Sequence, residues 1–184
     1  GLDAGVILAS GFAASAIGPE GTVFSSDFLD NNGNDPDLED LVDGPITDYS
    51  ILEFDFVPTG DSLRFRYVFG SEEYPNWICS EFNDAFGFFL SGPGIAGPYT
   101  NGAINIALLP DGTTPVSINN VHEADEFDPT GCPATNETYY VNNTNGATIS
   151  YGGFTTVLTA FALVQCGETY HIKLAIADAG GTSD

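Results

Sequence analysis

The residues best suited to chemistry in this sequence are carboxylates at the ends of strongly apolar segments. Glu72 and Glu73 follow one such segment, Asp84 precedes a second, and Asp178 lies near the end of a third. A carboxylate leaving a core strand must be solvated, hydrogen-bonded or bound to a cation, because burying it unpaired is costly. Calcium prefers oxygen ligands of this kind. We therefore expect these four acids to form a calcium site, with the capping of tight turns as the alternative.

A second group of oxygen ligands lies in the acidic segment 27–43. An EF-hand loop starting at Asp30 would need glycine at its sixth position and glutamate at its twelfth. The sequence has Asp35 and Leu41 there, so it is not an EF-hand. Calcium binding remains a hypothesis for this segment, and a cluster of Asx turns is the alternative. The candidate ligands are Asp30, Asn32, Asn34, Asp35 and Asp37.

Three aromatic residues in Pro- and Gly-rich segments suggest carbohydrate binding. Tyr74, Trp77 and Tyr99 could form a platform on which a glycan stacks. Packing of these rings on the edge of the fold is the alternative.

Catalysis has less support. His122 and His171 are the only histidines, and no Gly-x-Ser-x-Gly sequence is present. Adjacent carboxylates leave a glycan-directed hydrolase open as a less favoured alternative. However, 26 acids make chance pairs common, so we predict that the domain is not an enzyme.

Charge restricts the partners. The chain has 26 acidic and only three basic residues, a net charge of −23. Such a surface repels phosphate backbones and anionic lipid, so we expect no nucleic acid partner. No apolar run approaches the ~20 residues of a membrane span, so we expect no membrane insertion. Cations are the natural counter-species.

The three cysteines show no zinc-binding spacing. One disulfide, Cys79–Cys132, in an oxidising extracellular compartment is one interpretation. Three buried thiols, including Cys166, are the other.

Short segments rich in β-branched and aromatic residues run along the whole chain, with Gly, Pro, Asn and Asp between them. This pattern predicts an all-β fold, an antiparallel β-sandwich or jelly roll, with residues 1–184 as a single domain. The predicted strands are Gly5–Ser10, Ser50–Val57, Ser62–Phe69, Phe86–Leu90, Ile104–Leu109, Val116–Val121, Thr138–Asn142, Thr148–Tyr151, Thr155–Val164 and Thr169–Ala177.

Two of these strands are expected to form a hairpin. Ser50–Val57 and Ser62–Phe69 alternate apolar and charged residues and are separated by a Pro-Thr-Gly-Asp turn. Pairing Val57 with Ser62 sets Asp55 against Arg64 and Glu53 against Arg66. Opposite charges across strands contribute about 0.2–1 kcal/mol per pair and fix the register.

Long ordered strings in the chain resemble the choice-of-anchor L domain. They are LEFDFVP (52–58), FRYVFGSEEY (65–74), FNDAFGFFLSGPG (82–94), TPVSINNV (114–121) and YHIKLAIADAG (170–180). The resemblance implies a secreted or cell-surface bacterial module, often from Bacteroidetes, within a larger exported protein. It implies no particular reaction.

Members of that family usually have a further strand before the first residues and another after the last. We therefore expect that the chain is a fragment of a larger surface protein, or that a strand is supplied from elsewhere. An unfilled sheet edge would accept a strand from another copy or another surface domain, and head-to-tail contacts would give a filament. The predicted function is adhesion or surface assembly, stabilised by calcium.

Overall fold

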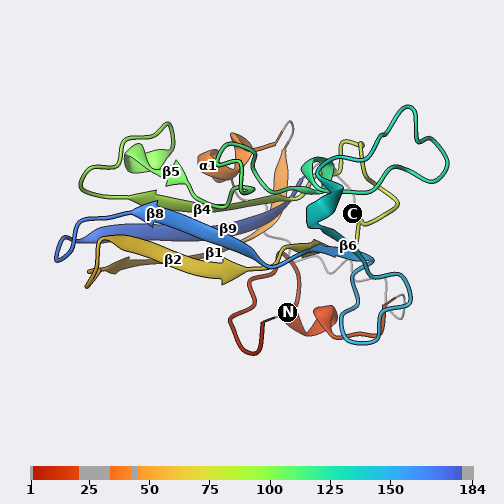
Figure 1. Cartoon of the computed structure of the whole chain (residues 1–184), viewed down its shortest axis with the longest axis horizontal. Helices are drawn as coiled ribbons and strands as arrows, with labels where there is room; N and C mark the ends of the chain where they lie inside the picture. Colours follow the sequence, from red (N-terminus) through yellow and green to blue (C-terminus); the bar gives the residue numbers. More distant parts are fainter. Residues whose placement is uncertain (1, 21–33, 43–44, 180–184) are drawn as a thin grey trace.

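The computed structural model describes residues 2–20, 34–42 and 45–179, and these residues form an all-β structure, as the sequence predicts. Figure 1 shows the arrangement. The strands are β1 (Ile46–Phe56), β2 (Ser62–Tyr67), β3 (Gly70–Ser71), β4 (Ala85–Ser91), β5 (Ile104–Asn105), β6 (Tyr140–Asn142), β7 (Gly153–Thr155), β8 (Leu158–Leu163) and β9 (Tyr170–Ala179). One short helix, α1 (Pro36–Glu39), and 3₁₀ turns at Ala13–Ala16, Thr100–Gly102, Ile118–Asn120 and Glu137–Tyr139 complete the described elements.

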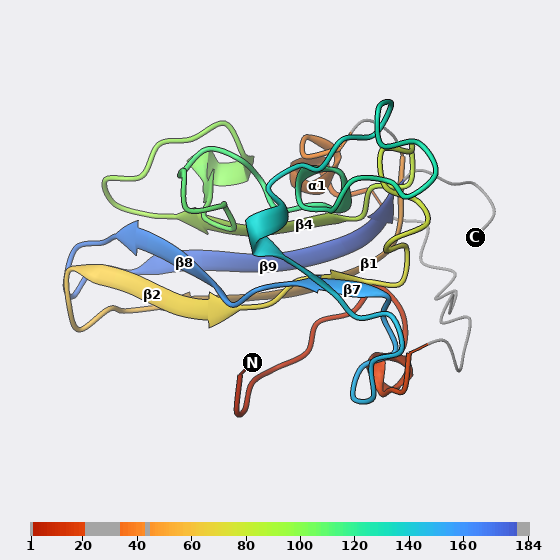
Figure 2. The same cartoon turned by 45° about the vertical axis from the view of Figure 1, so that its right-hand side comes forward.

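The largest sheet has the strand order β1-β9-β4-β5, and all its pairings are antiparallel. Two smaller sheets, β2-β8 and β3-β7-β6, contain the remaining strands. Aromatic rings join the layers: Phe65 of β2 lies 4.9 Å from Phe88 of β4, and Tyr67 lies 5.4 Å from Phe86, measured between ring centroids. The main core therefore lies between the large sheet and the β2-β8 pair, and Figure 2 shows these layers from a second direction.

On the opposite face of the large sheet, α1 covers part of β4 and β9. Leu38 is fully buried there against small residues of β9, Ala175 and Ala177, and against Phe89 of β4. Small side chains on β9 let this short helix approach the sheet closely. In the described part of the chain, no helix is long and apolar enough to cross a membrane.

The predicted hairpin is wrong. β1 pairs with β9, which sets Glu53 against Lys173 and Asp55 against His171. β2 pairs with β8, which sets Arg64 against Phe161. Alternation holds for β2, where Leu63 and Phe65 pack against the core while Arg64 and Arg66 are exposed, but Leu52 and Phe54 of β1 are 40% and 46% exposed. Alternation also carries no information on which strand lies alongside. The apolar face of β2 packs across the core onto β4, so the turn at 58–61 crosses between layers.

Several other predicted strands are shorter or absent. Residues 5–10 and 148–151 lie outside any strand, and Val116–Val121 contains a 3₁₀ turn. Within Ile104–Leu109, strand β5 covers Ile104 and Asn105, and Leu108 forms an isolated bridge with Pro115. These segments have strand-like composition, but several of their backbone bonds go to loops: the Leu109 amide, for example, donates to the Thr114 carbonyl at 2.8 Å.

Candidate metal centre

Asp84 and Asp178 lie side by side at the end of the large sheet. β4 pairs with β9 with Ala85 opposite Ala177, and one step further places Asp84 opposite Asp178. The Asn83 amide donates to the Ala179 carbonyl at 3.0 Å and continues the ladder. Because side chains alternate along a strand, Asp84 points to the same face as Phe86, a residue of the main core. Both carboxylates therefore enter the space between the layers.

The other layer supplies Glu72 and Glu73, which directly follow β3. The bridge between the layers is Ser71, which is buried and whose hydroxyl donates to Asp84 Oδ2 at 2.9 Å. The same hydroxyl accepts from the Glu73 amide at 3.1 Å. This arrangement brings carboxylates from three separate segments of the chain to one place, and we call Glu72, Glu73, Asp84 and Asp178 the Asp84 cluster.

The pKa of Asp84 reflects the three neighbouring carboxylates. Burial raises the pKa of Asp84 well above its ordinary value, and the negative charges of Glu73, Asp178 and Glu72 raise it further. The hydrogen bond from Ser71 acts in the opposite direction. Burial, together with Glu72, Asp84 and Asp178, also raises the pKa of Tyr151 to about 12. A cation would relieve this repulsion, because an opposite charge favours the ionised carboxylate.

The spacing of the Asp84 cluster is wider than that of a formed metal site. Two ligands of one calcium ion are at most about 5 Å apart, since each lies about 2.5 Å from the ion. Among the described residues, three ligand atoms come within 4.8 Å of one another only at Cys79, His122 and Cys132. Ion binding would therefore have to draw the carboxylates of the Asp84 cluster closer together.

The second predicted calcium segment is organised differently. Asp30 and Asn32 lie outside the described residues, and Asn34 is exposed. Asp35 caps α1 by accepting from the Asp37 and Leu38 amides, both at 3.1 Å. Lys173 of β9 bonds to Asp35 at 2.9 Å and also to Asp37. A lysine therefore balances the two buried aspartates of this segment.

The three candidate glycan-binding aromatics do not share a surface. Tyr74 is buried in the main core, where its hydroxyl donates to the Val121 carbonyl at 2.7 Å. Tyr99 packs edge-on against Phe89, with ring centroids 4.8 Å apart. Only Trp77 is substantially exposed, at 52%, and its ring contacts Phe82.

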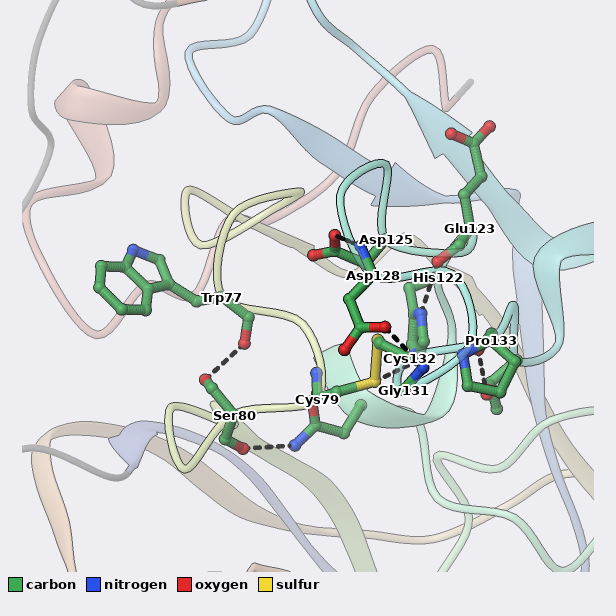
Figure 3. The surroundings of a disulfide bond; sticks show 12 residues. Trp77, Cys79, Ser80, His122, Glu123, Asp125, Asp128, Gly131, Cys132 and Pro133 are labelled. Atoms are coloured by element: carbon green, nitrogen blue, oxygen red, sulfur yellow. Dashed lines mark hydrogen bonds between the residues drawn. A yellow bond between two sulfur atoms is a disulfide. The ribbon is translucent and has the colours of Figure 1, made fainter.

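Cys79 and Cys132 form a disulfide, which is one of the two interpretations that the sequence left open. The other, three buried thiols, is wrong, and Cys166 is an exposed free cysteine. Figure 3 shows His122 beside the disulfide. Its Nε2 atom lies 3.8 Å from Cys79 Sγ, and its Nδ1 atom lies 2.6 Å from the Glu123 carbonyl oxygen. Sulfur atoms joined in a disulfide are not thiolate ligands, so this group is not a metal centre in the oxidised protein.

Sequence reasoning missed Ser71, Tyr151 and the structural role of His122. Ser71 could have been predicted as a neighbour of the cluster, because it directly precedes Glu72 at the end of a strand. Tyr151 and His122 come from loops whose position the sequence pattern does not determine.

The fold and the Asp84 cluster define an acidic, disulfide-containing all-β module in which three further carboxylates lie near the buried Asp84; Glu73 and Asp178 are half-buried, and Glu72 is exposed. The chain belongs to the choice-of-anchor L domain family, whose model matches residues 1–183. This family comprises secreted or cell-surface modules and is not an enzyme family. No curated protein and no solved structure matches the chain.

Proposed function

We propose that this domain is a non-catalytic extracellular module that serves adhesion or assembly at the bacterial surface and is stabilised by calcium at the Asp84 cluster. The observation that carries the calcium proposal is the convergence of three further carboxylates on Asp84, which is only 8% exposed. Like charges gathered at a buried position are unfavourable unless protons or a cation neutralise them.

The three basic residues of the chain lie at other places, so a cation that neutralises the Asp84 cluster would come from solution. Lys173 pairs with Asp35 and Asp37, and Arg64 and Arg66 are exposed on β2. Extracellular calcium is a hard cation that suits carboxylate, hydroxyl and carbonyl oxygens. The Ser71 hydroxyl and the carboxylates of the Asp84 cluster supply oxygens of the required kind.

A buried carboxyl with a raised pKa would also suit a general acid, but the surroundings of Asp84 do not favour catalysis. The cavity beside His122, of about 180 Å³, is lined by none of the four carboxylates of the Asp84 cluster. Asp84 itself is only 8% exposed, which leaves little of its surface for a substrate to contact. A carbohydrate-binding role would depend on Trp77 alone, and we do not propose it.

Thermal unfolding with calcium and with EDTA tests the proposal. Calcium at about 100 times its dissociation constant should stabilise the wild-type domain by about 2.7 kcal/mol. Asp84→Asn should lose most of this response, because it removes the central negative charge. Asp37→Asn is the matched control, since Asp37 is also a buried aspartate but pairs with Lys173, and it should keep the full response.

Two results would contradict the calcium site. One is a wild-type domain that melts identically in calcium and EDTA, and the other is a full calcium response in Asp84→Asn. Asp178→Asn, measured by titration calorimetry with calcium, provides a second variant should Asp84→Asn fold poorly.

A further inference from the structure

One face of the β2-β8 sheet is exposed and combines apolar and cationic side chains. Its residues alternate with those that enter the core: on β2 they are exposed at Ser62, Arg64 and Arg66, and on β8 at Thr159, Phe161 and Leu163. Arg64 lies opposite Phe161 and Ser62 opposite Leu163, so these side chains share one surface. We call this surface the β2-β8 outer face.

The apolar part of the outer face is unusually open. Leu163 is 72% exposed and Phe161 is 46% exposed. The Arg64 guanidinium lies over the Phe161 ring, 5.2 Å from its centroid, and this contact holds the arginine against the aromatic surface. Large apolar side chains gathered on a surface indicate an interaction site.

The outer face also holds both arginines of a chain whose net charge is −23. The third basic residue, Lys173, is committed to Asp35 and Asp37. Among the described residues, neither Arg64 nor Arg66 forms an ion pair. The outer face is therefore a cationic and apolar patch on an otherwise acidic protein, and it suits an acidic partner that carries an apolar side chain.

The same chain carries such a partner surface. The loop of residues 123–128, which we call the acidic loop, presents Phe127 with 91% of its surface exposed. Asp125, Glu126 and Asp128 flank this ring in the sequence. An aromatic ring surrounded by carboxylates is complementary to arginines beside Phe161 and Leu163.

The acidic loop is held in place before any partner binds. Asp125 Oδ1 accepts from the Phe127 and Asp128 amides at 2.7 and 2.8 Å. The Asp125 amide donates to the Cys132 carbonyl at 3.0 Å, and Cys132 is tied to Cys79 by the disulfide (Figure 3). A preorganised loop loses less conformational entropy on binding, so binding through the exposed ring has a smaller entropic penalty.

A cavity next to Phe127 strengthens the charge complementarity. It has a volume of about 180 Å³, and Glu123, Asp125, Glu126 and Phe127 are among its lining residues. Three carboxylates around a hollow beside an aromatic ring provide what an arginine requires: acceptors for its planar fork and a surface for its stem.

The two surfaces lie at different ends of the molecule. In Figures 1 and 2, β2 and β8 occupy the left half, while the turquoise segment that contains the acidic loop projects from the right-hand part. Because the surfaces are different and far apart, a contact between them in two copies leaves a free surface at each end. Such a heterologous contact continues into a chain of copies, either open or closed into a ring.

We propose that the β2-β8 outer face of one copy binds the acidic loop of a second copy. Phe127 packs on Phe161 and Leu163, and Arg64 and Arg66 face the carboxylates around the cavity. A second copy of the chain is thus the partner in the assembly role proposed above, and this inference rests on that role. The contact does not involve the Asp84 cluster.

The test is sedimentation velocity of the whole chain, with Cys166→Ser throughout to prevent intermolecular disulfides. Protein concentration is raised to about 1 mM, where even a contact with a dissociation constant of about 1 mM populates complexes. The chain should sediment as oligomers of increasing size, and these should weaken between about 50 and 500 mM salt because the charges are exposed. Phe127→Ser and Arg64→Glu/Arg66→Glu should each remain monomeric. Phe12→Ser, which removes another exposed phenylalanine, should assemble like the parent.

A mixture of the two monomeric variants gives the sharpest outcome. Each retains one intact surface, so an equimolar mixture should form a one-to-one complex and nothing larger. A monomeric parent, unchanged assembly of Phe127→Ser, or assembly that EDTA abolishes and salt does not affect would each overturn the proposed contact. If the parent is monomeric but calcium still stabilises the domain in a way that depends on Asp84, this inference is wrong and the calcium site is retained.

Discussion

Two groups of buried aspartates meet the same electrostatic problem on opposite faces of one strand. At α1, Asp35 and Asp37 bond to Lys173 of β9. At the Asp84 cluster, β9 contributes Asp178, so a further negative charge meets Asp84. Lys173 and Asp178 are an odd and an even residue, and alternation along the strand sends them to opposite faces. One strand thus neutralises one acidic group and adds to the charge of the other.

The pKa shifts express this difference. Burial raises the pKa of Asp37, but hydrogen bonds from Lys173 and the Thr100 amide outweigh it, and the pKa lies below its ordinary value. Burial and three neighbouring carboxylates shift the pKa of Asp84 in the opposite direction. Burial alone therefore does not decide the charge state of these aspartates; the identity of the neighbours does. An acidic group with an internal lysine has a structural role, whereas one without a lysine is a candidate for an ion.

The largest effect is expected from Lys173→Met. It leaves Asp35 and Asp37 buried without their cation, and breaking a buried pair in this way costs about 3–5 kcal/mol. Urea unfolding in EDTA measures the loss. Arg66→Met is the control, because Arg66 is exposed and forms no ion pair with a described residue, and it should stay within about 0.5 kcal/mol of wild type. Similar small losses in both variants would show that the lysine contributes little.

A smaller effect, and a different one at the two sites, is expected from neutralising each aspartate without calcium. Asp37→Asn loses a charge-assisted bond to Lys173 and should destabilise the domain by about 1.5–3 kcal/mol. Asp84→Asn keeps an oxygen that accepts from Ser71 and removes a like charge, so the free energy of unfolding should be unchanged or higher. Urea unfolding in EDTA compares the two variants, and equal destabilisation would remove the distinction between the sites.

The sequence predicted the members of the Asp84 cluster because each adjoins a strand whose pattern is clear. Glu72 follows β3, Asp84 precedes β4, and Asp178 lies near the end of β9. Alternation also gave the core and solvent faces of β2. The sequence does not determine that these strand ends meet: Asp84 and Asp178 lie together because β4 pairs antiparallel with β9.

The partners of the basic residues could not be predicted, since they depend on strand order. Lys173 reaches Asp35 across 138 residues of sequence, and Arg64 lies opposite Phe161 because β2 pairs with β8. Local charge complementarity suggested a hairpin between neighbouring strands, but packing of Phe65 and Tyr67 across the core contributes more than exposed charge pairs. Disulfide pairing and loop positions likewise follow from the assembled fold.

The smallest expected effect is an acid transition specific to Asp37. Its pKa is lower in the folded state than its ordinary value, so the folded protein binds fewer protons, and its stabilisation is present above about pH 4 and lost as the pH falls further. The groups that face it are Lys173, which stays charged, and Thr100, whose amide donates at 2.7 Å; Asp35 shares the lysine. The comparison uses Asp84→Asn as the parent, since the raised pKa of Asp84 acts in the opposite direction. In EDTA, the urea midpoint of this parent should fall more steeply between about pH 6 and 3 than that of the double variant Asp37→Asn/Asp84→Asn. Parallel curves would show that Lys173 does not hold Asp37 in its charged form.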